Sequence, residues 1–425
     1  MASVTESQIA IVKATAPVLQ EHGVTITTVF YENLLRENPD LHNVFSSTSQ
    51  VTGRQPRALA GAVLGYATYI DDLPKLKHAV ERIAHKHVSL QVTPAQYDVV
   101  GKYLIQAIGQ VLGDAATPEI VDAWVAAYGV LAGVFINREG EMYKANAAEN
   151  WVGWRKFRIS RKVQESSAIT SFYLTPADGT NLPLPTFFPG QYVSLQVFVP
   201  ELGYLQSRQY SLSEGPNPKG EYYRISVKKE DAVAAAGVPG IISNMLHAGY
   251  AVGDEVELSH PQGEFYVDPT DAAKDGVPAV LISAGVGATP LKAILDSLTA
   301  AAGRPRPPVK RPVSWIHSAR SSAAQPFGDS VRQICRENES VTANVFLRNL
   351  GPEDQAGVNY EFGDMRLDLA KLDRDRDLFV GNPAAEYFIC GPEPFMIDVR
   401  AALEGLGVDR SRIFLELFAT GDVPA

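Results

Sequence analysis

The chain has 425 residues, which at roughly 100 to 200 residues per domain predicts about two to four domains, with three as the expected number. Hydrophobic residues make up 45% and charged residues 20% of the sequence, a composition that predicts packed cores and excludes an intrinsically disordered chain. Thirty-eight Lys and Arg stand against 48 Asp and Glu, and because the net charge of -10 supplies no basic field, no nucleic-acid partner is expected.

The sequence also predicts a reducing compartment. Its two cysteines, Cys335 and Cys390, are too few for a disulfide framework and too far apart to suggest a zinc site. Residues 1–18 mix charged and polar side chains into the apolar ones, so they lack the core of a signal peptide. No stretch approaches the roughly 20 apolar residues of a membrane helix. We therefore expect a cytoplasmic protein without a membrane span.

Three patterns of apolar residues follow one another along the chain. Residues 5 to about 146 place apolar residues at helical spacing between Gly- and Pro-containing breaks, which predicts an all-helical domain. After Trp151 the pattern alternates like antiparallel strands and predicts a small β-barrel or sandwich. From Val277, short apolar runs alternate with helical stretches, which predicts an α/β domain with a parallel sheet. The expected domains are residues 1–146, 152–267 and 275–425.

The helical domain contains a histidine with informative neighbours. Leu76, Val80, Ile83 and His87 fall at spacings of four, three and four, so His87 continues the apolar face and points inward, whereas His85 lies on the outer face. A lone inward histidine is usually an ordinary core residue. Glu139, however, lies on an otherwise apolar stripe of another helix, and a buried carboxylate needs a partner.

Residues 1 to about 146 resemble a globin of the flavohemoglobin family. The resemblance implies that His87 is the proximal haem ligand, with Tyr97 and Glu139 completing a network behind it. A carboxylate behind an iron-bound imidazole raises its basicity, which suits a catalyst better than an oxygen carrier. The residues that carry the resemblance are Phe30-Tyr31, the Asn38-Pro39-Asp40-Leu41 helix start, Phe45, Gln55, Leu59, Lys86-His87, Tyr97 and the segment Tyr128 to Glu139. It further implies that Phe45 packs on the porphyrin and that Tyr31, Gln55 and Leu59 form the distal pocket.

Two later segments predict nucleotide binding. Arg208-Gln209-Tyr210-Ser211 combines a forked donor for a pyrophosphate, a flat aromatic face and a hydroxyl, and the helix start at Gly240 and Ser243 could take phosphates. In the third domain, Gly285 and Gly287 follow a strand and let the backbone approach a pyrophosphate, with Thr289 expected to cap the next helix and Pro290 to begin it. Cys390-Gly391-Pro392 repeats the strand-turn-helix arrangement.

These segments resemble the ferredoxin-NADP reductase family, which forms the C-terminal part of flavohemoglobins, so the resemblance covers essentially the whole chain. One departure is Ala419-Thr420 after Phe418, where the family commonly has Gly-Pro. Cys390 remains open to the simpler interpretation of a small core residue. The resemblance implies FAD binding by Tyr192, Arg208, Gln209, Tyr210, Ser211, Gly240 and Ser243, with Glu416 and Phe418 beside the flavin. It implies nicotinamide binding by Gly285, Val286, Gly287, Ala288, Thr289, Pro290, Cys390, Gly391 and Pro392.

The function implied by the resemblance is that of a nitric oxide dioxygenase, a detoxifying oxidoreductase that converts nitric oxide and oxygen to nitrate. Electrons would pass from NADH or NADPH through FAD to haem b. Arg320 in the segment His317 to Ser321 could accept a 2′-phosphate or simply be solvated, so the preferred nucleotide stays open. The alternatives are a haem-flavin reductase of oxygen or hydroperoxides, and a sensor of oxygen or nitric oxide, although no output domain is recognisable. The oligomeric state is open, with a monomer favoured.

Overall fold

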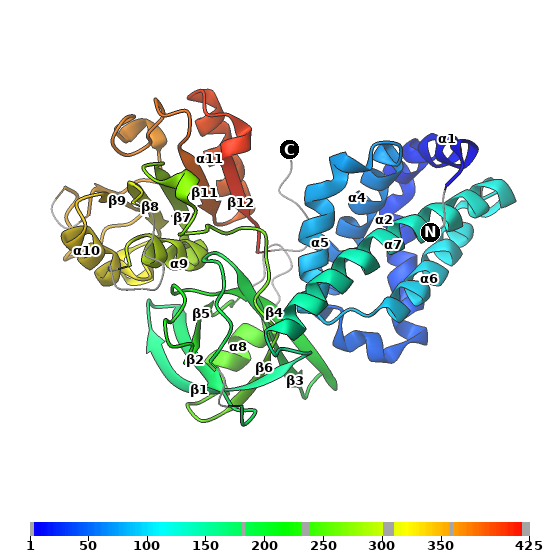
Figure 1. The fold of residues 1–425 in the computed structure, drawn as a ribbon, viewed down its shortest axis with the longest axis horizontal. Coiled ribbons are helices and arrows are strands. Elements are labelled where there is room, and N and C mark those ends of the chain that lie inside the picture. Colours follow the sequence, from blue (N-terminus) through cyan, green and yellow to red (C-terminus); the bar gives the residue numbers. More distant parts are fainter. Residues whose placement is uncertain (1–3, 181–182, 232–238, 301–309, 358–359, 419–425) are drawn as a thin grey trace.

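The computed structural model describes residues 4–180, 183–231, 239–300, 310–357 and 360–418. A helical part is followed by a six-stranded antiparallel sheet and then by a six-stranded parallel sheet with flanking helices, which confirms the expected fold class. Figure 1 shows the antiparallel sheet below, with the other two parts above it on either side. Ala419-Thr420, the departure from the family pattern, lies outside the described residues.

The helical part begins and breaks where local sequence directs it. Thr5 and Gln8 cap the start of the first helix reciprocally, and Thr93 and Gln96 do the same later in the chain. Prolines occupy first turns, where their missing N–H has no helical partner to lose. The helices are α1 (Glu6–Ala14), α2 (Ala16–Glu37), α3 (Ser47–Val51), α4 (Arg54–Tyr69), α5 (Lys77–Ser89), α6 (Pro94–Leu112) and α7 (Pro118–Ala148). Short 3₁₀ turns lie at Pro39–Asn43, Leu73–Leu76 and Gly113–Ala115.

Helix α7 is the one helix, within the described ranges, whose length and hydropathy would let it cross a membrane. The sequence analysis did not identify this helix as a candidate membrane span. It packs against α1, α5 and α6, and it carries Glu139, which is 3% exposed. A charged side chain is costly in a bilayer, so these contacts favour a core helix over a membrane span.

The antiparallel sheet closes into a barrel. Its strand order is β4-β3-β6-β1-β2-β5, and a bridge between Leu212 and Ile225 links the two ends. Inward-facing aromatic and aliphatic residues fill its core, among them Phe157, Phe172 and Leu258. The elements are β1 (Arg155–Gln164), β2 (Ile169–Pro176), β3 (Tyr192–Val199), β4 (Tyr204–Ser211), β5 (Tyr223–Lys228), β6 (Glu255–Leu258) and the helix α8 (Ile241–Ala248).

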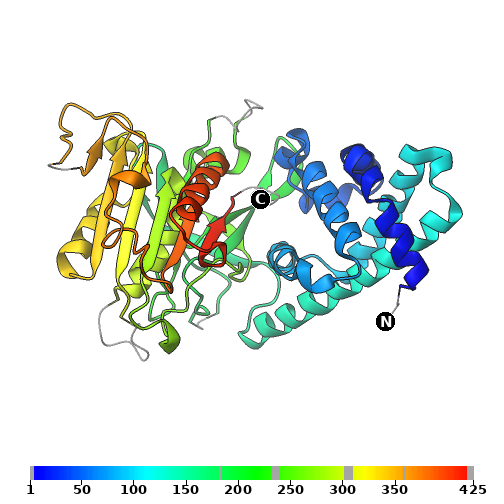
Figure 2. The same cartoon turned by 90° about the horizontal axis from the view of Figure 1, so that it is seen from above.

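The last part is a parallel sheet with a hydrophobic cluster on each face. Its order, β10-β9-β8-β7-β11-β12, changes direction after β7, because the chain first adds strands on one side and then on the other. Figure 2 shows this part and the helical part at opposite ends of the molecule. The elements are β7 (Ala279–Ala284), α9 (Ala288–Leu298), β8 (Val313–Ala319), α10 (Gly328–Glu337), β9 (Val341–Leu347), β10 (Phe362–Gly363), β11 (Glu386–Cys390), α11 (Glu393–Gly405) and β12 (Ile413–Glu416).

One expected helix boundary was wrong. Thr289 does not cap α9 and Pro290 does not begin it, because a 3₁₀ turn at Gly285–Gly287 runs directly into a helix that starts at Ala288. The Thr289 hydroxyl instead donates to the carbonyl of Val286 over 2.9 Å. The proline still lies in the first turn, so it removes no helical hydrogen bond.

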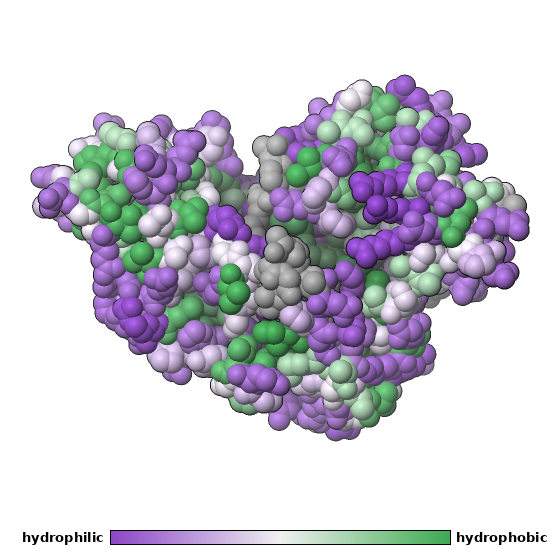
Figure 3. All heavy atoms as spheres, turned by 180° about the vertical axis from the view of Figure 1, so that it is seen from behind, coloured by the Kyte–Doolittle hydropathy of each residue, from purple (hydrophilic) through white to green (hydrophobic). Residues whose placement is uncertain are grey.

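The helical part is docked on the barrel by direct hydrogen bonds. Asn43 accepts from the backbone N–H of Leu205 at 2.8 Å, and the Gln206 amide donates to the carbonyl of His42 at 2.7 Å. His85, expected on an outer face, is covered by the barrel, where its Nδ1 lies 2.8 Å from Oε1 of Gln262. The face in Figure 3 is mainly hydrophilic, in keeping with the acidic composition, and is hollowed between the helical and α/β parts.

Candidate functional site

His87 forms the centre of a buried hydrogen-bond network. Its Nδ1 lies 2.8 Å from both the Tyr97 hydroxyl and Oε1 of Glu139, and Tyr97 donates to the same oxygen at 2.5 Å. Burial, followed by the hydrogen bond to Glu139, raises the pKa of Tyr97, so the phenol keeps its proton. An ionised carboxylate only accepts, so Nδ1 of a neutral imidazole carries the hydrogen and Nε2 holds the available lone pair. No described residue hydrogen-bonds Nε2.

A second polar group lies within the apolar interior of the same domain. Tyr31 on α2 is 5% exposed, and Gln55 on α4 hydrogen-bonds its phenol. Phe45 packs edge-on against the Tyr31 ring, with the centroids 5.4 Å apart, and Leu59 follows Gln55 by one turn of α4. Burial raises the pKa of Tyr31, which keeps the phenol protonated and able to donate.

The side chains around His87 fit a large, flat, apolar group. A domain of this size normally has one continuous core, but this one has two clusters, one centred on α2, α4 and α6 and the other on α5 and α7. Several apolar residues packed against these clusters are only partly buried, and the inward-facing His87 side chain retains 30% exposure. A haem edge would cover these groups and place Nε2 on its iron. The partly buried residues include Phe45, Leu59, Val80, Ile83 and Leu131.

A chain of hydrogen bonds runs from beside His87 into the barrel. Lys86 donates to Oε1 of Gln209, whose amide donates to Ser194 at 2.8 Å, and Ser194 donates to Ser89 at 2.9 Å. Burial lowers the pKa of Lys86 to about 8. The network connects α5, which carries His87, to the strands expected to bind the flavin. Sequence reasoning missed Ser89 and Ser194, because no local pattern reveals a contact between residues so far apart in the chain.

The predicted flavin residues gather along the edges of β3 and β4. Tyr192 and Ser211 are register partners, and burial raises the pKa of both Tyr192 and Tyr210. Oγ of Ser211 is buried with no hydrogen-bond partner in the part of the chain described, as expected of a hydroxyl that meets a ligand. Arg208 donates to Thr48 of the helical part at 2.9 Å and to the carbonyl of Ser207 at 2.7 Å, which occupies two of its five N–H donors.

The start of α8 and the C-terminal residues Glu416 and Phe418 are also predicted to contact the flavin. Gly240 is the N-cap of α8 without a side-chain cap, which leaves first-turn N–H groups available, and α8 contacts β4 and β5. The Ser243 hydroxyl turns back to the carbonyl of Gly240 at 3.4 Å. Burial, followed by the charge of Glu264, raises the pKa of Glu416 to about 8, and the nearby Phe418 ring is 49% exposed. An exposed aromatic face can stack on a ring system.

The expected nicotinamide residues meet at the carboxyl ends of β7 and β11. Gly285 adopts φ +56°, which favours glycine, and a Cβ on Gly287 would lie 2.2 Å from the carbonyl oxygen of Cys390. The turn after β7 therefore touches the end of β11. Position 287 must be glycine because any side chain there would collide with Cys390. Burial raises the pKa of the Cys390 thiol, and this residue pairs in register with Glu416 of β12. The turn thus lies beside the candidate flavin region.

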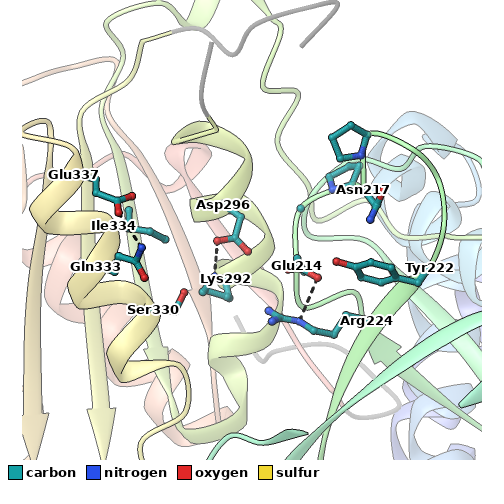
Figure 4. A pocket seen from close by; sticks show the side chains of 13 residues that line it. Glu214, Asn217, Tyr222, Arg224, Lys292, Asp296, Ser330, Gln333, Ile334 and Glu337 are labelled. Atoms are coloured by element: carbon teal, nitrogen blue, oxygen red, sulfur yellow. Dashed lines mark hydrogen bonds and ion pairs between the residues drawn. The ribbon is translucent and has the colours of Figure 1, made fainter. Parts of the chain in front are cut away.

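A separate cavity of about 370 Å³ lies between the barrel and the α/β part (Figure 4). Its lining includes two ion pairs, Lys292 with Asp296 and Arg224 with Glu214, the latter at 3.9 Å. None of the predicted site residues lines this cavity. It belongs to the junction between the two parts rather than to the candidate site.

Comparison with known proteins identifies the family. A Globin family model matches residues 28–135. The flavohemoprotein of Bordetella pertussis is 46% identical over 417 residues, covering 97% of this chain and 98% of that protein. Flavohemoprotein A of Dictyostelium discoideum is 40% identical, with 98% of both chains covered.

Solved structures agree with this assignment. The flavohemoglobin from Malassezia yamatoensis, determined with bound FAD and heme, has a TM-score of 0.82 at 30% identity and covers 98% of this chain and 100% of that one. The FAD/NAD-binding domain of nitric oxide dioxygenase from Vibrio cholerae, at 34% identity and a TM-score of 0.50, covers 62% of this chain and 97% of that one. The similarity thus extends from the globin helices through both sheets, and the chain belongs to the flavohemoprotein family.

Proposed function

We propose that this protein is a nitric oxide dioxygenase, an NAD(P)H-dependent oxidoreductase that detoxifies nitric oxide by converting it to nitrate. The observation that carries the proposal is the buried Glu139 carboxylate behind Nδ1 of His87. A storage globin has no need of a buried carboxylate at this position, whereas a catalyst gains from a more basic imidazole. The Vibrio cholerae relative bears the name of this activity.

The proposal assigns haem b to the globin part, held by His87 and packed against Phe45 and Leu59. The predicted barrel residues would hold FAD, with Glu416 and Phe418 beside it, and the turns at Gly285–Pro290 and Cys390–Pro392 would hold NADH or NADPH. The Malassezia yamatoensis relative contains FAD and heme, which supports this set. When bound, these groups accept a hydride, pass single electrons and bind oxygen.

The protein's own residues would orient the bound groups and control the positions of protons around them. Glu139 and Tyr97 hold the proton on Nδ1 of His87, which leaves the Nε2 lone pair available to a metal ion. Tyr31, kept protonated by burial and hydrogen-bonded by Gln55, would donate a hydrogen bond into the distal pocket and favour retention of oxygen there. The hydrogen bond from Lys86 to Gln209 holds the globin part against the barrel, which would keep the haem and flavin sites close to each other.

We further propose that residues 1–146, 152–267 and 275–425 are the three domains, and that the protein acts as a cytoplasmic monomer. Substrates are then the small molecules nitric oxide, oxygen and NAD(P)H. The Glu139 carboxylate behind His87 also supports reduction of hydroperoxides as a second activity, since electron donation from the proximal side of a haem would assist O–O cleavage.

The test is nitric oxide removal in aerated buffer by the holoenzyme with NADH or NADPH, followed electrochemically, with nitrate and oxidised nucleotide counted at the end. We expect nitrate at about two per NAD(P)H, because each hydride carries two electrons and each nitric oxide consumes one. Glu139→Gln is the matched variant, and it should lower nitric oxide turnover while leaving flavin reduction intact. Nucleotide oxidation with persistent nitric oxide, or a faster rate with peroxide, would overturn the assignment.

A further inference from the structure

Two arginines stand side by side at the carboxyl edge of the parallel sheet. Ala319 and Leu347 are register partners at the ends of β8 and β9, and the next residues are Arg320 and Arg348. The ladder continues past the strands, because Arg348 donates its N–H to Ala319 at 3.0 Å and Asn349 donates to Arg320 at 2.9 Å. The two arginines therefore occupy adjacent positions.

Neither guanidinium is neutralised by a carboxylate in the described part of the chain. Both residues are exposed, and neither side chain takes part in an ion pair among the described residues. Nearby carboxylates serve the backbone: Asp354 accepts from Gly351 at 2.8 Å and Asp364 from Leu350 at 3.2 Å. Two adjacent positive charges without a partner repel each other and favour an anion between them.

The strand order places Arg320 and Arg348 near the adenosine end of a dinucleotide bound to this sheet. Ligands of open parallel sheets lie across the carboxyl ends, at the point where strand order reverses, here between β7 and β11. The nicotinamide must reach the flavin region near Glu416, on the β11 and β12 side. The adenosine half then extends the other way, over β8 and β9, whose spacing of about 5 Å per strand puts both within its reach.

The composition of this edge discriminates between the two nucleotides. Residues 313–325 contain no Asp or Glu, so the end of β8 offers no carboxylate to accept a hydrogen bond from a ribose 2′-hydroxyl. A guanidinium, by contrast, matches the planar geometry of phosphate oxygens and pairs with them through two N–H groups. Ser321, next to Arg320, can add a hydroxyl donor.

We propose that the hydride donor is NADPH, selected over NADH by Arg320 and Arg348, which bind its 2′-phosphate. This inference rests on the proposed function only in that it places a nicotinamide nucleotide on the turn at Gly285. The binding mode requires the two arginines to act together, because both contact the same phosphate.

The first test follows anaerobic reduction of the flavin in the holoenzyme by absorbance after rapid mixing with NADPH or NADH. We expect the wild type to prefer NADPH, and Arg320→Ala and Arg348→Ala each to lower the preference about 10- to 100-fold by slowing the reaction with NADPH. Arg336→Ala is the matched control, since it removes another exposed arginine, at the end of α10 and before β9 begins. A wild-type preference for NADH, or a preference unaffected by both variants, overturns the inference.

A second test does not depend on any reaction. Calorimetry compares binding of 2′,5′-ADP (adenosine 2′,5′-bisphosphate) with that of 5′-AMP, which differ only in the 2′-phosphate. Tighter binding of 2′,5′-ADP that is lost in both arginine variants supports the inference, and equal affinity of the two fragments refutes it. If neither nucleotide reduces the flavin, the proposed function fails, but this comparison still decides whether the edge recognises a 2′-phosphate.

Discussion

Replacement of Gly287 by alanine should separate hydride transfer from every other property of the protein. Gly287 has φ -60°, which any residue adopts, so the constraint is purely steric. The added Cβ would lie 2.2 Å from the carbonyl oxygen and 2.4 Å from the carbonyl carbon of Cys390, where 3.4 Å is an ordinary contact. Relief requires the β7–α9 turn and the end of β11 to move apart by roughly 1 Å, a misplacement that typically costs about 100-fold in rate.

The assay is the rate of anaerobic flavin reduction by NADPH, with FAD content, the haem spectrum and the thermal unfolding temperature measured alongside. We expect Gly287→Ala to reduce the flavin about 100-fold more slowly while it retains haem and FAD, because the globin and barrel contacts are untouched. Gly405→Ala is the control, since a Cβ there meets nothing within 4 Å. Flavin reduction at the wild-type rate in Gly287→Ala would refute the argument that contact between the two turns positions the nucleotide.

Three further outcomes are expected. Tyr31→Phe removes the buried donor and should speed oxygen release by about tenfold or more, measured by stopped flow, and an unchanged rate contradicts its proposed role. His87→Ala should lose the Soret band per mole of protein yet reduce flavin at close to the wild-type rate, and retention of haem would exclude His87 as the ligand. Burial lowers the pKa of His317 to about 4, so the unfolded chain takes up the proton first and stability falls as pH drops from about 6.5 to about 4. His317→Leu should flatten this dependence in thermal melts, and a slope equal to that of the wild type would show that other groups cause it.

Much of the candidate site was visible in the sequence because helix and strand periodicity determine the direction of a side chain. The spacing from Leu76 to His87 directs the imidazole inward, and the stripe on α7 does the same for Glu139. The structure places these two side chains 2.8 Å apart. The alternation after Trp151 and the later apolar runs likewise predicted the two sheets, since these patterns arise from local burial.

Local patterns were less informative about boundaries and exposure. Thr289 was expected to cap a helix, but the preceding 3₁₀ turn let the helix begin earlier. His85 was expected on an outer face, and α5 does have one, but the barrel covers it. Periodicity says which face of a helix is apolar and does not say whether another domain lies against the polar face.

The amino-acid sequence by itself determined which residues face inward and where a strand, a glycine turn and a helix follow one another, because backbone preferences and side-chain periodicity are properties of a short segment. Only the tertiary structure decided which distant groups meet. Lys86 bonds Gln209, and Arg320 stands beside Arg348, through contacts between separate elements. Such contacts depend on how whole helices and sheets pack, since strand register and domain docking bring together groups that no single segment contains.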